Sequence, residues 1–92
     1  MLISKKIKKL NKLAHLVVAD YLCEEAPDYV MIGLENDGDI WTATVMYENC
    51  GDGHPQYIDY VKPNSLILCG EGKTLLKALN VLESRIISYL GE

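Results

Sequence analysis

Two short stretches of the sequence carry side chains that could do chemistry. Cys50, Asp52 and His54 offer a thiolate, a carboxylate and an imidazole, which are all zinc ligands. A closed zinc site needs further ligands, and the sequence has no C-x-x-C pair beside them. A cysteine nucleophile would need His15 or His54 as its base, and no G-x-S-x-G motif or glycine-rich oxyanion loop accompanies either. We therefore expect no metal, no cofactor and no enzymatic activity.

The second stretch is Gly70–Thr74, with the order Gly-Glu-Gly-Lys-Thr. It is similar to the end of a P-loop, the turn that cradles phosphates. The first glycine of that pattern would stand at position 67, which is occupied by Ile67. We therefore interpret Gly70 and Gly72 as a turn between a strand and a helix, and Thr74 as the N-cap of that helix.

Charged residues are distributed unevenly along the chain. Residues 1–12 carry five lysines, and the next basic residue after Lys12 is Lys62. Residues 13–92 hold 4 basic and 13 acidic groups, a net charge of -9, although the whole chain has only -4. Such asymmetry steers partners of opposite charge. The interval without a basic residue contains ten acids: Asp20, Glu24, Glu25, Asp28, Glu35, Asp37, Asp39, Glu48, Asp52 and Asp59.

The acidic interval has two interpretations. Carboxylates along a strand edge and a loop can occupy phosphate positions on a basic site, because arginine and lysine bind both groups. Exposed tyrosines beside them would act as interface anchors. Alternatively, the acids only keep turns and a sheet face solvated. On the first interpretation the partner-binding residues are Asp37, Asp39, Glu48, Asp52, Tyr57, Asp59 and Tyr60.

The lysine-rich segment also has two interpretations. Lys5, Lys6, Lys8 and Lys9 could bind nucleic acid or another anionic surface. They could equally form the charged outer side of a helix whose other side packs in the core. The overall acidity of the chain disfavours both nucleic acid and a membrane as partners.

Apolar periodicity predicts the secondary structure. Spacings of three and four from Ile3 to Tyr21 indicate an amphipathic helix, and alternation on both sides of Asn36-Asp37-Gly38 indicates a β-hairpin. A short strand over Gln56–Val61 stays an open question. The other expected elements are strands over Tyr29–Glu35, Asp39–Glu48 and Ser65–Cys69, and a final helix over about Thr74–Leu90.

These elements predict one α+β domain over residues 1–92. A helix is followed by a three- or four-stranded antiparallel sheet and a second helix, and both helices pack on one face. The other face is then exposed, and Thr42 and Thr44 fit it. The apolar runs are too short to span a bilayer, and three irregularly spaced cysteines indicate a reducing cytoplasm.

The stretch Tyr29–Ile87 resembles the small HicB antitoxin family. The resemblance is carried by a Tyr-led strand (Tyr29–Leu34), an Asp-Gly turn (Asn36–Asp39), an aromatic second strand (Ile40–Ala43) and a helix entry (Gly72–Leu79). It implies a β-β-β-α core and a small toxin as partner.

The helix–sheet–helix outline, with small size and acidity, also resembles small phage-encoded inhibitors of host defence, including some anti-CRISPR proteins. Our main hypothesis is therefore a non-enzymatic inhibitor that docks an acidic surface on the basic site of a nucleic-acid-binding host protein. The alternatives are a HicB-like antitoxin or regulator, a nucleic-acid-binding module that uses the lysines, and a homodimer joined through the exposed sheet face.

Overall fold

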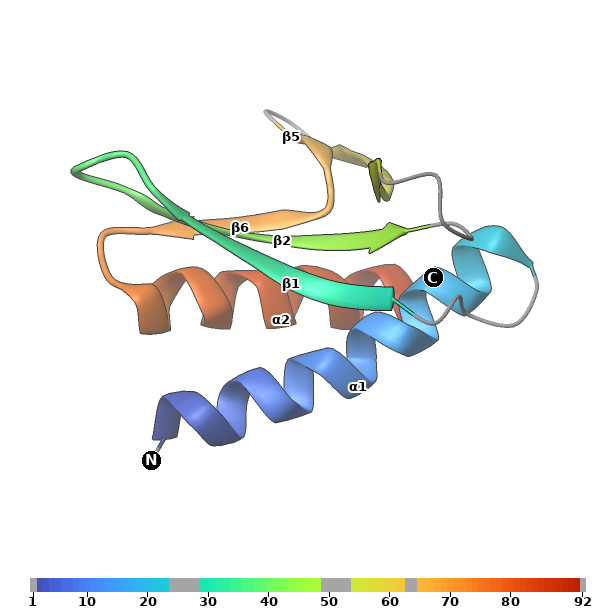
Figure 1. Cartoon of the computed structure of the whole chain (residues 1–92), viewed down its shortest axis with the longest axis horizontal. Helices are drawn as coiled ribbons and strands as arrows, with labels where there is room; N and C mark the ends of the chain where they lie inside the picture. The colour runs from blue at the N-terminus through green and yellow to red at the C-terminus, as the bar shows by residue number, and fades with distance from the viewer. Residues whose placement is uncertain (1, 24–28, 49–53, 63–64, 92) are drawn as a thin grey trace.

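The computed structural model describes residues 2–23, 29–48, 54–62 and 65–91, with the backbone only at 59–62, 65 and 66. Helices are the first and last elements, and six strands lie between them (Figure 1). The helices are α1 (Leu2–Leu22) and α2 (Leu75–Gly91), and the strands are β1 (Tyr29–Asn36), β2 (Trp41–Glu48), β3 (Pro55–Tyr57), β4 (Asp59–Lys62), β5 (Ser65–Ile67) and β6 (Cys69–Gly72).

Both helices follow the apolar stripes of the sequence. The stripes bury Leu10, Ala14, Val17 and Val18 of α1 and Ala78, Leu79, Leu82 and Ile86 of α2. The expected N-cap of α2 is confirmed, because the backbone N–H of Lys77 donates to Thr74 Oγ1 over 3.1 Å. Neither helix in the described part of the chain is long and apolar enough to cross a membrane.

The expected β1–β2 hairpin is confirmed with a continuous antiparallel register from Tyr29↔Glu48 to Asn36↔Trp41. The turn between the strands is built by its own side chains. Asp37 Oδ1 accepts the backbone N–H groups of Asp39 (3.0 Å) and Ile40 (2.9 Å). Gly38 has a φ of 109°, a conformation that glycine adopts without steric cost.

The second half of the sheet is interrupted by a projecting hairpin. β3 pairs with the end of β2 and β6 with its beginning, so both lie along the same edge of β2. Between them the chain leaves the sheet as the β4–β5 hairpin. Ile58 and Leu68 mark the branch point, where both are fully buried and Leu68 N–H donates to Ile58 O over 2.9 Å. The open question over Gln56–Val61 is thus answered by two short strands.

The sheet has one covered face and one face without a helix. α1 packs against β1, and α2 packs against β6 and β2, both on the same side (Figure 1). Their stripes meet the alternate residues of β2, since Ala43, Val45 and Tyr47 are buried. This confirms the single-domain α+β architecture, with a four-stranded antiparallel sheet and both helices on one face.

Gly70 and Gly72 do not form the expected turn, because both belong to β6. Their role is close packing of α2. A Cβ at Gly70 would lie 2.3 Å from the backbone N of Leu82 and 2.4 Å from the carbonyl O of Ala78. The helix therefore rests directly on the strand, and no other residue fits at position 70 without moving the α2 backbone.

Candidate functional site

Neither helix covers the second face of the sheet (Figure 1). Side chains directly opposite each other in an antiparallel ladder project to the same face. The register therefore places Met31 beside Met46, and Gly33 beside Thr44, on this face. The Met46 side chain lies across Gly33, because a Cβ built there would be 2.7 Å from Met46 Cε.

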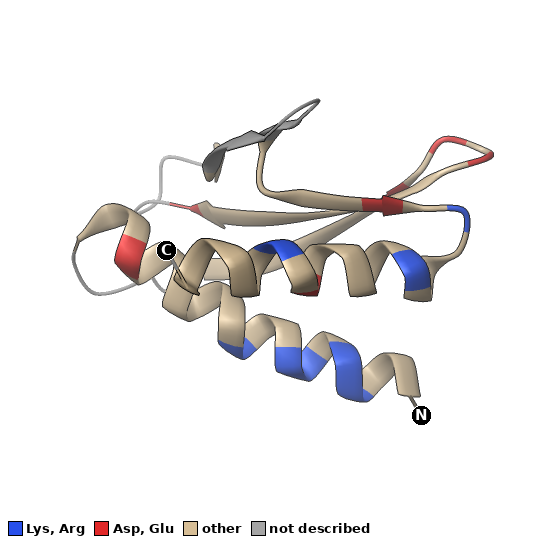
Figure 2. Ribbon diagram, turned by 180° about the vertical axis from the view of Figure 1, so that it is seen from behind, with Lys and Arg blue, Asp and Glu red and all other residues tan. Residues whose placement is uncertain are grey.

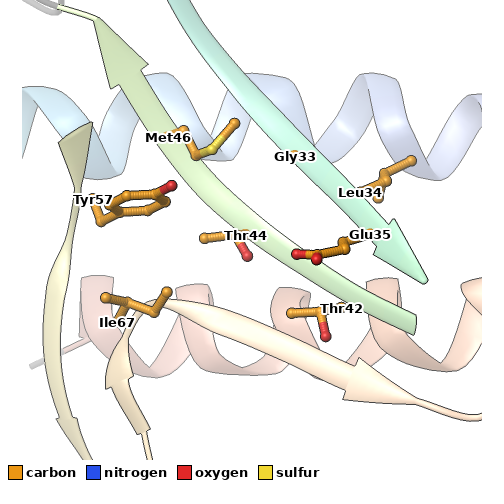
Figure 3. Close-up of a pocket in the computed structure, with 8 residues that line it drawn as sticks. All are labelled: Gly33, Leu34, Glu35, Thr42, Thr44, Met46, Tyr57 and Ile67. Carbon is orange, nitrogen blue, oxygen red and sulfur yellow. The ribbon is translucent and has the colours of Figure 1, made fainter. Parts of the chain in front are cut away.

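The projecting β4–β5 hairpin turns part of this face into a hollow of about 380 Å³. Figure 3 shows Glu35 and Tyr57 pointing toward Thr44 from opposite sides. Only Glu35 among the lining residues is charged at neutral pH. The full lining is Gly33, Leu34, Glu35, Thr42, Thr44, Met46, Tyr57 and Ile67.

One end of the helix-free face is bordered by carboxylates. Thr42 pairs with Glu35 on one side and with Glu71 on the other, so the two acids flank it. Glu71 points away from α2, because its neighbour Gly70 faces that helix. Both carboxylates are exposed, and neither is ion-paired within the described residues.

The β1–β2 turn extends this acidic border. Asp37 and Asp39 are exposed at its tip. Hydrogen bonds from the backbone N–H groups of Ile40 and Asp39 lower the pKa of Asp37, because they favour its charged form. Asp37 thus stabilises the turn as well as carrying charge. Glu35, Asp37, Asp39 and Glu71 are called the acidic rim below (Figure 2).

The structure brings together only part of the partner-binding set expected from sequence. Asp37 and Asp39 belong to the acidic rim, and Tyr57 lines the hollow. Glu48 lies half-buried at the end of β2 that is far from the acidic rim. Seven residue steps separate it from Trp41 at the start of the strand, a distance of roughly 23 Å. Asp59 and Tyr60 are in β4, where only the backbone is described, and Asp52 lies outside the described residues.

Glu35 and Glu71 were missing from the expected set. The alternation of β1 already places Glu35 on the same face as Met31 and Gly33, so the sequence held a signal for it. No local sequence signal indicated Glu71, because its position depends on pairing between β2 and β6, which are far apart in the sequence.

The lysines of α1 divide into two groups. Lys6 Nζ lies 2.9 Å from Glu83 Oε1, and Lys9 Nζ lies 3.0 Å from Glu83 Oε2 on α2. These contacts lower the pKa of Glu83, because both lysines favour its charged form, and the contact with Lys6 has the larger effect. Lys5 and Lys8 are exposed and join no ion pair within the described residues. Half of the expected nucleic-acid-binding set therefore helps to join the helices.

The two stretches considered first in the sequence are described only in part. The described residues contain no group of three potential metal ligands, and Cys50 and Asp52 lie outside them. The Gly-Glu-Gly-Lys-Thr stretch forms a strand end and a helix cap. No family model, curated protein or solved structure matches the chain.

Proposed function

We propose that this chain is a non-enzymatic protein that binds the basic surface of a protein partner through its helix-free face. The observation that carries the proposal is the hollow on that face with the acidic rim beside it. The strands β1, β2, β3 and β6 and the β1–β2 turn contain no lysine or arginine, whereas Lys62 ends β4 of the projecting hairpin and Lys73 follows β6. A partner with arginines and lysines would be steered toward it and bound there.

Binding of this kind would inhibit a partner that uses its basic surface for nucleic acid. Carboxylates accept the same hydrogen bonds from arginine and lysine as phosphate oxygens do. An acidic protein seated on such a surface excludes the nucleic acid sterically and by charge. The inhibitors of host defence that the outline of the chain resembles would be one class of such proteins. The three irregularly spaced cysteines suit a reducing cytoplasm as the place of action.

A second candidate is the antitoxin-like protein implied by the HicB resemblance. The free edge of β1 favours it, because among the described strands β1 pairs with β2 alone. Residues Tyr29–Leu34 of this edge carry no charge. A partner strand added there would bind through backbone hydrogen bonds and apolar contacts, with weak dependence on salt.

The experiment is capture of a partner from host lysate with three tagged forms of the chain. They are the wild type, the double variant Glu35→Lys/Glu71→Lys, and the matched control Lys5→Glu/Lys8→Glu on α1. Each capture is repeated after nuclease treatment and at about 0.05 M and 0.5 M NaCl, which spans weak to strong screening. The recovered protein is then purified, and its nucleic-acid binding is measured with and without the chain.

We expect a stoichiometric protein that survives nuclease, is released by salt and loses its nucleic acid when the chain is added. The Glu35→Lys/Glu71→Lys variant should bind it at least about tenfold more weakly, and the α1 variant should bind it normally. A partner unaffected by salt and by rim reversal would favour the antitoxin-like candidate. If recovery of the partner depends on nucleic acid, or on Lys5 and Lys8, both the proposed docking function and the antitoxin-like candidate are contradicted.

A further inference from the structure

The hollow on the helix-free face is framed by two groups that attract cations. The Glu35 carboxylate enters it from β1 and the Tyr57 side chain enters it from β3 (Figure 3). We propose that this hollow receives one arginine side chain of the protein partner. This inference rests on the proposed function and names the group that the helix-free face recognises.

The charge of the hollow selects a cation. Glu35 is its only charged lining residue, and Glu71 lies across Thr42 from it. Within the described residues neither carboxylate has an ion-pair partner. A positive side chain entering between them would gain charge-assisted hydrogen bonds that the free chain does not make.

Tyr57 adds an aromatic surface at the other side of the hollow. Its register partner Met46 fixes it beside β2, and 43% of the residue remains exposed. Cations bind to the faces of aromatic rings, and arginine does so more often than lysine. The Tyr57 ring opposite the Glu35 carboxylate therefore suits a group that can stack on the ring and donate hydrogen bonds to the carboxylate at the same time.

The remaining lining favours arginine over lysine. The hydroxyl oxygens of Thr42 and Thr44 are further acceptors on the floor, which suits the several N–H donors of a planar guanidinium. The apolar atoms of Met46 and Ile67 can contact the methylene stem of the side chain. The volume of about 380 Å³ is at the small end for ligand pockets, which suits one side chain presented by a protein.

The test uses small probes that isolate one side chain. Backbone amide shifts of the full chain are followed by NMR while N-acetyl-argininamide is added. N-acetyl-citrullinamide, which has nearly the same shape without charge, and N-acetyl-lysinamide are added in parallel. The series is repeated with Glu35→Gln, Tyr57→Leu and the matched control Glu48→Gln, which changes a carboxylate at the far end of β2.

We expect saturable shifts at Gly33, Thr44 and Tyr57 with the arginine probe. Binding should weaken about two- to fivefold in Glu35→Gln and in Tyr57→Leu, and stay unchanged in Glu48→Gln. The citrulline probe should shift these amides little, and the lysine probe should bind more weakly than the arginine probe.

Absence of saturable shifts, or equal shifts with citrulline, would overturn the inference. Equal binding of the lysine probe would overturn the assignment to arginine. If the probes fail while Glu35→Lys/Glu71→Lys still abolishes partner capture, the hollow is not the recognition site but the docking function stands. If partner capture is insensitive to the rim, the proposed function itself fails.

Discussion

The two faces of the sheet are made by alternate residues of the same strands, yet they serve different purposes. On β2, Ala43, Val45 and Tyr47 face the helices and are at most 6% exposed. Their neighbours Thr42 and Thr44 face the other way and are only half-buried. One face is thus filled by the core, and the other keeps polar side chains accessible.

Charges differ between the two sides in the same way. Glu83, between the helices, is ion-paired with both Lys6 and Lys9. Glu35 and Glu71, on the helix-free face, have no ion pair within the described residues. The comparison teaches that Glu83 on the helix side helps to hold the two helices together, whereas Glu35 and Glu71 on the sheet side stay exposed to solvent.

The largest expected effect is on the covered face, at Gly70. Gly70→Ala places a Cβ against the backbone of Leu82 and Ala78, which cannot move without shifting α2. We expect a loss of about 3 kcal/mol or more in the free energy of unfolding, measured by chemical denaturation. The matched control is Gly91→Ala, where nothing lies within 4 Å, and it should change stability by less than about 0.5 kcal/mol. Equal effects of the two variants would show that α2 does not rest on β6.

A smaller effect is expected for the ion pairs between the helices. Glu83→Gln should lower the free energy of unfolding by about 1–2 kcal/mol at neutral pH, because Lys6 loses a charged partner in a half-buried place. Each kcal/mol of lost stability should lower the Tm of a domain of this size by roughly 4–8 °C.

The pH dependence of this effect has a definite sign. The pKa of Glu83 in the folded chain is below its ordinary value of 4.5, so its contribution is complete above that pH and is lost as the pH falls further. The stability difference between wild type and Glu83→Gln should therefore shrink below about pH 4.5. A difference that stays constant to low pH would mean that the carboxylate is not held by the lysines.

A still smaller effect is expected at the β1–β2 turn. Asp37 should titrate below its ordinary value of 3.8 in an NMR pH titration of side-chain carboxyl shifts, because two backbone N–H groups bind its charged form. Its stabilising contribution is present above that value and is lost as the pH falls. Titration at or above 3.8 would mean that the turn is not held by Asp37.

The smallest effect on stability is expected on the helix-free face itself. Glu35→Lys/Glu71→Lys should change the free energy of unfolding by less than about 0.5 kcal/mol, since both side chains are exposed and join no ion pair in the described part of the chain. The same variant should nevertheless abolish partner capture. A large loss of stability would break the comparison, because the face would then be part of the fold.

Long periodic segments were predictable from sequence, whereas short strands were predictable only in part: the expected strand Ser65–Cys69 is divided at Leu68 between β5 and β6. α1, the β1–β2 hairpin and α2 each repeat their apolar pattern often enough to be recognised, and their stripes dictate which face they cover. The strands of three or four residues between Pro55 and Gly72 have no such repeat. A Gly-x-Gly between a strand and a helix indicates a turn as readily as close packing, so the role of Gly70 required the position of α2.

The candidate site was predictable only where it is local. Asp37 and Asp39 follow from the turn sequence. The hollow depends on the hairpin that leaves the sheet at Ile58 and Leu68, and the pair Glu35 and Glu71 depends on the register of β6 against β2. Both are set by contacts between distant parts of the chain.

The most direct test of the central claim is hydroxyl-radical footprinting of the chain, free and bound to its captured partner. We predict that Met31, Met46 and Tyr57 on the helix-free face are protected in the complex, whereas the exposed Leu2 and Leu16 of α1 are oxidised equally in both states. Protection of Leu2 and Leu16 with unchanged oxidation of Met46 and Tyr57 would contradict the claim, because the partner would then lie on the helix side.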